Sequence, residues 1–108
     1  MLKLFVFVPD DRKLINKIMA IAAKAGAGKI GNYTGCAFIT KGTGNWKSEK
    51  GSHPVIGKVG TYSHEPEVRI EMLCPEDKAA AVKTAILKIH PYEEPEIDFI
   101  QLVQIIEK

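Results

Sequence analysis

A sandwich of the α+β class, with one antiparallel sheet and two helices on a single face of it, is the fold that this sequence predicts. The chain has 108 residues, the length of one small domain. Its apolar residues recur either every second position, as in strands, or every third and fourth position, as in helices. These segments follow the order strand, helix, strand, strand, helix, strand, which is the ferredoxin-like βαββαβ arrangement. We therefore expect a single domain over residues 1–108.

The first half opens with a strand and a helix. Residues 2–8 are rich in β-branched and aromatic side chains, which is typical of a strand in the centre of a sheet. After Pro9, Asp10 or Asp11 can cap a helix, and Gly26 is suited to end it. The apolar stripe of this helix consists of Leu14, Ile15, Ile18, Ile21, Ala22 and Ala25.

A second strand and a long connection are predicted to follow. Tyr33–Lys41 alternates loosely and would place Cys36 in a buried position in the middle of a strand. Residues 42–54 are rich in glycine and polar side chains, and connections of this length often carry function. Residues 55–59 are expected to form a short strand that closes the connection.

The second half repeats the pattern. Glu67–Leu73 alternates cleanly, Pro75 opens a helix, and Ile97–Ile106 is the last strand. Right-handed crossovers place the first and third strands at the centre of the sheet. The second helix buries Val82, Ala85, Ile86 and Ile89. The predicted core consists of Leu4, Val6, Ile18, Ala22, Val68, Ile70, Val82 and Ile86.

Composition excludes several classes of partner. Fifteen basic and thirteen acidic residues give a net charge of +2, too little to indicate binding to nucleic acid. Wholly apolar runs such as residues 4–8 are far shorter than the roughly 20 residues that span a bilayer, and no signal-peptide pattern is present. Cys36 and Cys74 are isolated and expected to be free, as in a reducing compartment. We expect a cytoplasmic protein with no nucleic-acid or membrane partner.

Two glycine-rich segments suggest different chemistry. Gly26–Gly31 matches the letters of a dinucleotide fingerprint, but these glycines close a helix instead of opening one, so we interpret them as a turn. Residues 42–44 form either an anion cradle or a hairpin tip that needs glycine for its backbone angles. Trp46 and His53 follow closely and are candidates for contact with a ligand or a partner, because an exposed indole often anchors an interface.

The segment His90–Pro95 is a second candidate contact. Its two prolines stiffen the turn, so it loses little entropy on docking. Tyr92 offers a flat apolar body, and Glu93 and Glu94 need a cation if they are buried. His90 and Glu93 are the only candidates we raise for a metal ion, but a histidine that ends a helix is more often there because it suits the dipole. No catalytic residue and no cofactor are predicted. Cys36 falls in the middle of the expected strand, where a thiol is inert, and Cys74 has no histidine close in sequence.

Five stretches of the chain carry a family resemblance: Gly28–Phe38, Gly42–Gly44, His53–Gly57, Val68–Glu71 and His90–Pro95. Taken in this order, they resemble the domain inserted in YqfO-type members of the NGG-interacting-factor-three family. The resemblance runs over about Met1–Leu102, and its last stretch also resembles the His-Pro-Tyr-Glu turn of CutA proteins. Both resemblances imply a ferredoxin-like fold of the PII/CutA type, and both imply trimers.

The resemblance also limits the function that can be expected. The two-metal site of the family lies in flanking domains, so it supplies no metal ligand here. We expect a small, free-standing, non-catalytic domain that acts through homo-oligomerisation, as a trimer first and a dimer second. A small molecule or divalent ion bound between subunits is part of this expectation. The alternative is a subunit or accessory of a metal-dependent enzyme whose metal-carrying domains are on another chain.

Overall fold

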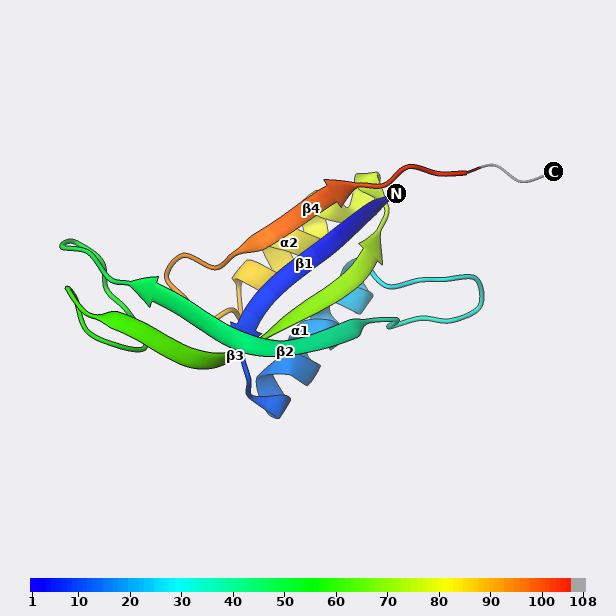
Figure 1. The fold of residues 1–108 in the computed structure, drawn as a ribbon. Helices are drawn as coiled ribbons and strands as arrows, with labels where there is room; N and C mark the ends of the chain where they lie inside the picture. The colour runs from blue at the N-terminus through cyan, green and yellow to red at the C-terminus, as the bar shows by residue number, and fades with distance from the viewer. Residues whose placement is uncertain (106–108) are drawn as a thin grey trace.

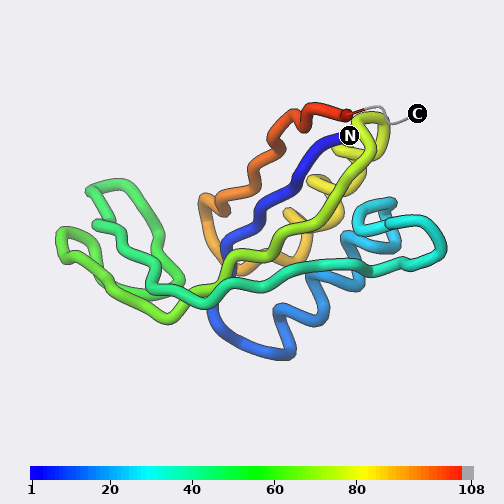
Figure 2. Tube along the Cα trace, turned by 45° about the vertical axis from the view of Figure 1, so that its right-hand side comes forward, coloured from blue at the N-terminus to red at the C-terminus, as the bar shows by residue number. Residues whose placement is uncertain are grey.

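The computed structural model describes residues 1–105, and within them four strands form one sheet (Figure 1). The strands lie in the order β2-β3-β1-β4, and every neighbouring pair is antiparallel. The helices α1 and α2 pack against each other on one face of this sheet (Figures 1 and 2). The predicted ferredoxin-like fold, with the first and third strands at its centre, is confirmed. The elements are β1 (Leu2–Pro9), α1 (Arg12–Ala25), β2 (Phe38–Lys47), β3 (Tyr62–Cys74), the 3-10 turn η1 (Glu76–Lys78), α2 (Ala79–Leu87) and β4 (Ile97–Gln101).

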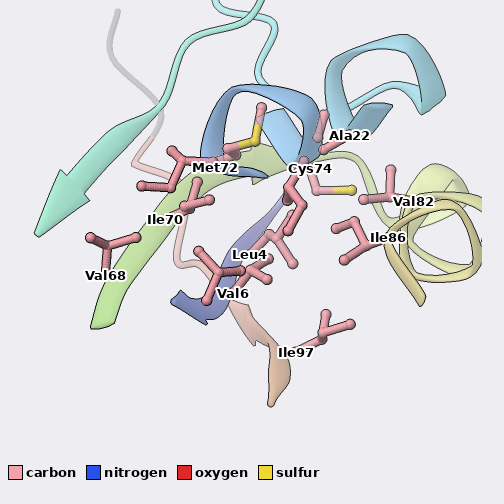
Figure 3. Packing of buried hydrophobic residues seen from close by; sticks show 14 residues of the cluster. Leu4, Val6, Ala22, Val68, Ile70, Met72, Cys74, Val82, Ile86 and Ile97 are labelled. Carbon is pink, nitrogen blue, oxygen red and sulfur yellow. The ribbon is translucent and has the colours of Figure 1, made fainter. Parts of the chain in front are cut away.

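The core lies between the two central strands and the helices (Figure 3). In β1 the even positions are buried and the odd positions lie on the opposite face, which we call the open face. β3 is in register with β1, so Ile70 lies opposite Val6 and both point at the helices. All eight predicted core residues are buried.

The ends of α1 are formed as predicted. The Asp11 carboxylate accepts hydrogen bonds from the backbone N–H groups of Lys13 and Leu14 at 3.1 and 3.4 Å. Gly26 ends the helix with a φ of 123°, a conformation that favours glycine. Gly28 follows at φ 80°, and a Cβ there would lie 2.8 Å from Met72 Cε. The Gly26–Gly31 segment is therefore a turn that is closely packed at Gly26 and Gly28 and open at Gly31.

The structure corrects the second strand. β2 begins at Phe38, so Cys36 lies before the strand and is only half-buried. β2 continues to Lys47, so the glycines that looked like a loop are strand residues: Gly42 pairs with Glu67 and Gly44 with Glu65. The backbone ladder forms because β3, with 13 residues, is longer than β2 and supplies a partner for each of its 10 residues. The connection lies instead at residues 48–61, where Val59 makes only an isolated bridge and no strand covers residues 55–59.

The second half differs from prediction at its boundaries. β3 begins at Tyr62, earlier than expected, and a 3-10 turn with Pro75 at its N-cap precedes α2. β4 ends at Gln101, opposite Leu2 of β1. Residues 102–105 have no strand beside them because β1 begins at Leu2, and Ile106, the predicted end of this strand, lies outside the described residues.

β2 and β3 extend beyond β1 and β4. Residues 42–47 of β2 and 62–67 of β3 project from the sheet as a two-stranded ribbon (Figures 1 and 2). The molecule is correspondingly extended. Its radius of gyration is 15.2 Å, against about 13 Å for a typical compact domain of this length. It exposes 7347 Å², against about 5,900 Å² for a compact monomer of this mass. Within residues 1–105 no helix is long and apolar enough to span a membrane.

Candidate functional site

The far end of the ribbon and the turn after α2 enclose a cleft of about 400 Å³, which we call the ribbon cleft. Four of the six residues singled out in the sequence line it: Trp46, Tyr92, Glu93 and Glu94. His53 and His90 each form a hydrogen bond with one of these four. The complete lining is Trp46, Lys47, Ser48, Glu49, Ser52, Pro54, Val55, Ile56, Tyr92, Glu93 and Glu94.

His90 fixes the turn to the sheet. Its imidazole is buried, Nε2 lies 2.8 Å from the Phe7 carbonyl oxygen, and Nδ1 accepts a hydrogen bond from the Tyr92 backbone N–H at 3.2 Å. Because Nδ1 accepts, Nε2 carries the proton and donates to Phe7, so the ring is neutral. Burial lowers the pKa of His90, and the Phe7 carbonyl and the charge of Glu67 partly offset this. To bind a metal ion, His90 would have to give up one of these two hydrogen bonds.

Tyr92 joins the turn to the ribbon. Its ring centroid lies 5.0 Å from that of His90 and 6.0 Å from that of Trp46, with the Trp46 and Tyr92 rings tilted by 54°. Its hydroxyl donates to Glu67 Oε2 at 2.8 Å. Burial, followed by the hydrogen bond to Glu67, raises the pKa of Tyr92, so the phenol is neutral at physiological pH. Trp46 is half-buried against this ring, whereas the sequence suggested an exposed indole.

Glu67 is the site residue that the sequence did not indicate. It lies on β3, 25 residues before Tyr92, and reads there as an ordinary outward-facing strand residue. Its carboxylate occupies the space beside Gly44, where a Cβ would lie 2.7 Å from it. The absence of a side chain at Gly44 therefore makes room for the carboxylate that holds Tyr92. An anion cradle at residues 42–44 is the wrong interpretation, because a negative group lies over this strand segment.

Three carboxylates lie in the lining. Glu93 Oε1 accepts a hydrogen bond from the His53 backbone N–H at 2.9 Å, which ties the turn to the connection of the ribbon. Glu49 lies 3.8 Å from the Lys47 ammonium group, and Glu94 is exposed. His53 thus contributes through its backbone, while its side chain is exposed.

The positions of the thiols and of the metal-ligating side chains relative to the ribbon cleft bear on its chemistry. Both cysteines are free, as predicted, and neither lines the cleft; burial raises the pKa of Cys74. Among residues 1–105 no three His, Cys, Asp or Glu side chains gather in a group able to hold a metal ion. The aromatic walls and carboxylates suit a bound molecule with an apolar body.

Comparison with known proteins identifies relatives of this segment. No protein-family model matches the chain. A GTP cyclohydrolase 1 type 2 homolog of Halalkalibacterium halodurans is 43% identical over 100 residues, which is 93% of this chain and 26% of the relative. The corresponding protein of Bacillus subtilis is 40% identical over 94% of this chain and 27% of its own length. The chain thus spans about a quarter of the length of the curated relatives that it matches.

Solved structures agree with this result. A Bacillus cereus protein related to NIF3 superposes with a TM-score of 0.81 at 34% identity, over 95% of this chain and 26% of that protein. A variant of CutA1 from Pyrococcus horikoshii superposes with a TM-score of 0.71 at 18% identity, over 99% of this chain and 88% of CutA1. The resemblance to a segment of NIF3-related proteins and to the CutA fold is confirmed.

Proposed function

We propose that this chain, which matches about a quarter of a GTP cyclohydrolase 1 type 2 homolog and folds like CutA, is a non-catalytic domain that assembles with copies of itself and binds a small ligand in the ribbon cleft. A cytoplasmic location is part of the proposal, because both thiols are free and a reducing compartment keeps them so.

The observation that carries the proposal is the ribbon cleft itself. Its volume of about 400 Å³ falls in the range of small-molecule sites, roughly 300–1,000 Å³. Its aromatic walls come from segments far apart in the chain and are fixed by hydrogen bonds from Tyr92 to Glu67 and from His53 to Glu93. The groups that could act as acid or base at neutral pH are already engaged, since His90 uses both ring nitrogens and Tyr92 stays neutral. Such an arrangement favours binding over catalysis.

Self-association is supported by the open face of the sheet, which no helix within residues 1–105 covers. Phe38 is 67% exposed there, and it shares a cross-strand row with Glu71 and Phe5. Ile100 on β4 is also exposed. We assign this face to a second copy of the chain, in a trimer first and a dimer second, as the resemblance to CutA implies.

Light scattering behind a sizing column, over a dilution series, tests the self-association. We expect the parent to be a trimer or a dimer at high micromolar concentration and Phe38→Glu to be a monomer, because a buried carboxylate without a partner opposes association. Leu87→Glu is the matched control, since Leu87 is an exposed apolar residue on the helical side. A parent that stays monomeric, or two variants that behave alike, would contradict this part of the proposal.

A thermal-shift screen of nucleotides, metabolites and divalent ions tests ligand binding. A ligand that binds only the folded state raises its melting temperature in proportion to the logarithm of ligand concentration over Kd. Hits should shift the parent and lose the shift in Trp46→Ala, which removes one wall of the ribbon cleft. Hits that shift Trp46→Ala equally bind elsewhere, and this would contradict the assignment to the cleft.

A role as an accessory of an enzyme on another chain is the second candidate. It is favoured by the length of the relatives, of which this chain spans about a quarter. The remaining part of the Halalkalibacterium halodurans homolog, purified and mixed with this chain, should then co-elute with it. Independent elution at micromolar concentration would remove this candidate.

A further inference from the structure

We infer that the ribbon cleft takes a small organic cation, namely a flat apolar group that carries an amidinium, guanidinium or ammonium charge. The inference rests on the ligand-binding part of the proposed function and names the chemical class of the ligand. It depends on the walls of the cleft and on the charges at its rim.

The walls present aromatic faces at an angle. The Trp46 and Tyr92 rings pack against each other, with centroids 6.0 Å apart and planes tilted by 54°, and both line the cleft, so a ligand that rests on this pair meets both π-systems. An aromatic face is negative at its centre and attracts a cation, and indole is the strongest of the natural rings in this respect. The Tyr92 hydroxyl donates to the Glu67 carboxylate, which shifts electron density onto the Tyr92 ring and strengthens that attraction.

The charges at the rim point the same way. Three lining side chains are carboxylates, and the single lysine of the lining, Lys47, is committed within the ribbon: its ammonium group lies 3.8 Å from Glu49 and 5.8 Å above the Tyr62 ring. Glu93 uses one oxygen for the His53 N–H, which leaves its other oxygen for a ligand. An anionic ligand would meet these carboxylates without a free cation in the described lining to balance them.

The apolar part of the cleft distinguishes an organic cation from a bare metal ion. Pro54, Val55 and Ile56 also line the cleft, and a metal ion would use none of these groups and neither ring. A molecule with an apolar body uses the rings and the aliphatic side chains together, while its charged end reaches Glu93 and Glu94. The charges at the rim and the apolar lining of the cleft therefore both favour an organic cation.

Three probes of equal size test the sign of the charge. Benzamidine, benzamide and benzoate share one ring and are cationic, neutral and anionic respectively at neutral pH. Trp46 is the only tryptophan of the chain, so its emission reports on the ribbon cleft directly. We expect benzamidine to change this emission saturably and to raise the melting temperature, benzamide to bind about tenfold more weakly, and benzoate to have no effect at the same concentrations.

Charge-neutralising variants locate the effect. Glu93→Gln and Glu94→Gln should each weaken benzamidine binding about three- to fivefold, since a partly exposed ion pair contributes modestly. The amide oxygen that Glu93→Gln introduces would still accept the His53 N–H, so the cleft keeps its form. Glu76→Gln, which removes an exposed carboxylate on η1, is the matched control and should bind as the parent does.

The outcomes distinguish ligand binding in the cleft, which is part of the proposed function, from the preference for a cation, which is the further inference. If benzamide or benzoate binds as well as benzamidine, or if Glu93→Gln and Glu94→Gln both bind like the parent, the cleft binds ligands but the cation assignment is wrong. If no probe and no compound of the wider screen changes the melting temperature or the Trp46 emission, ligand binding in the cleft fails as well. If the emission changes only when the oligomer dissociates, a second copy fills the cleft and the inference is overturned.

Discussion

The body of the sheet and the ribbon that projects from it are held in place by different physics. In the body, whole aliphatic side chains such as Leu4, Ile70 and Ile86 are fully buried between strands and helices. Along the ribbon the buried residues are small or polar, Gly44, Ser48 and Ser63, and its position depends on contacts with the turn at residues 90–95. The body supplies the stability of the domain, and the ribbon supplies a cleft at a modest cost in stability.

The largest effect should come from the body. Ile70→Ala removes a side chain that is 0% exposed at the centre of β3, and we expect it to lower the free energy of unfolding by about 3–4 kcal/mol, a large share of the typical 5–15 kcal/mol of a domain. Urea denaturation measures the loss. Val103→Ala, at an 86% exposed position, should change stability by less than about 0.5 kcal/mol. Equal losses would show that the body does not carry the stability.

A change in the turn should loosen the ribbon and leave the body intact. Tyr92→Ala removes the ring against Trp46 and the hydroxyl on Glu67, and we expect a loss of about 2 kcal/mol with faster amide hydrogen exchange in residues 48–56. Exchange in β1 should be unchanged. Tyr92→Phe keeps the ring and should cost about 1 kcal/mol, so it isolates the hydroxyl. Uniformly faster exchange across both regions would mean that they unfold as one unit.

Two glycines of β2 sharpen the comparison within the ribbon. A Cβ at Gly44 would lie 2.7 Å from the Glu67 carboxylate, whereas one at Gly42 would have nothing within 4 Å. Gly44→Ala should push Glu67 away from Tyr92, cost about 1–2 kcal/mol and alter the Trp46 emission. Gly42→Ala should be within about 0.5 kcal/mol of the parent or slightly more stable. Thermal unfolding followed by fluorescence compares the two, and a milder effect at Gly44 would contradict the packing of Glu67.

The smallest effect is the dependence on pH. Burial lowers the pKa of His90 below its ordinary value of 6.5, so at low pH the unfolded chain takes up this proton before the folded chain does. The contribution of neutral His90 to the free energy of unfolding is fully present above about pH 6.5. It is lost as the pH falls below this value, by at most about 1.4 kcal/mol per pH unit. His90→Gln should flatten the stability profile between about pH 6.5 and pH 5. A His90→Gln profile as steep as that of the parent would show that the imidazole is not the group that titrates.

The sequence predicts the body better than the ribbon for the same physical reason. Periodic apolar side chains reveal β1, α1 and the inward positions of β3, because burial there repeats along the chain. Gly42 and Gly44 have no side chain and give no periodicity, so their place in β2 depends on the partner strand alone. The end of β4 at Gln101 is likewise determined by where β1 begins.

The side-chain types of the candidate residues can be recognised in the sequence. They are the single tryptophan, Trp46, and the aromatic and paired acidic residues of the turn, Tyr92, Glu93 and Glu94. The sequence does not indicate that these residues line one cleft, because this depends on the end of the ribbon lying beside the turn at residues 90–95. The sequence gives no sign of Glu67, because its part in the site is a hydrogen bond with Tyr92, which lies 25 residues away in the chain.

The order of the sheet also bears on how the chain behaves at high concentration. β2 is an edge strand, so one side of its ten-residue backbone is unpaired within the described part of the chain. Another extended strand could pair with these free backbone groups. Lys41 and Lys47 place charges along this edge, and Lys41 lies 3.8 Å from Asp10. Lysines on an edge strand repel a second edge and discourage disordered stacking. The same residues oppose edge-to-edge pairing of this strand, so the assembly that we propose uses the open face of the sheet.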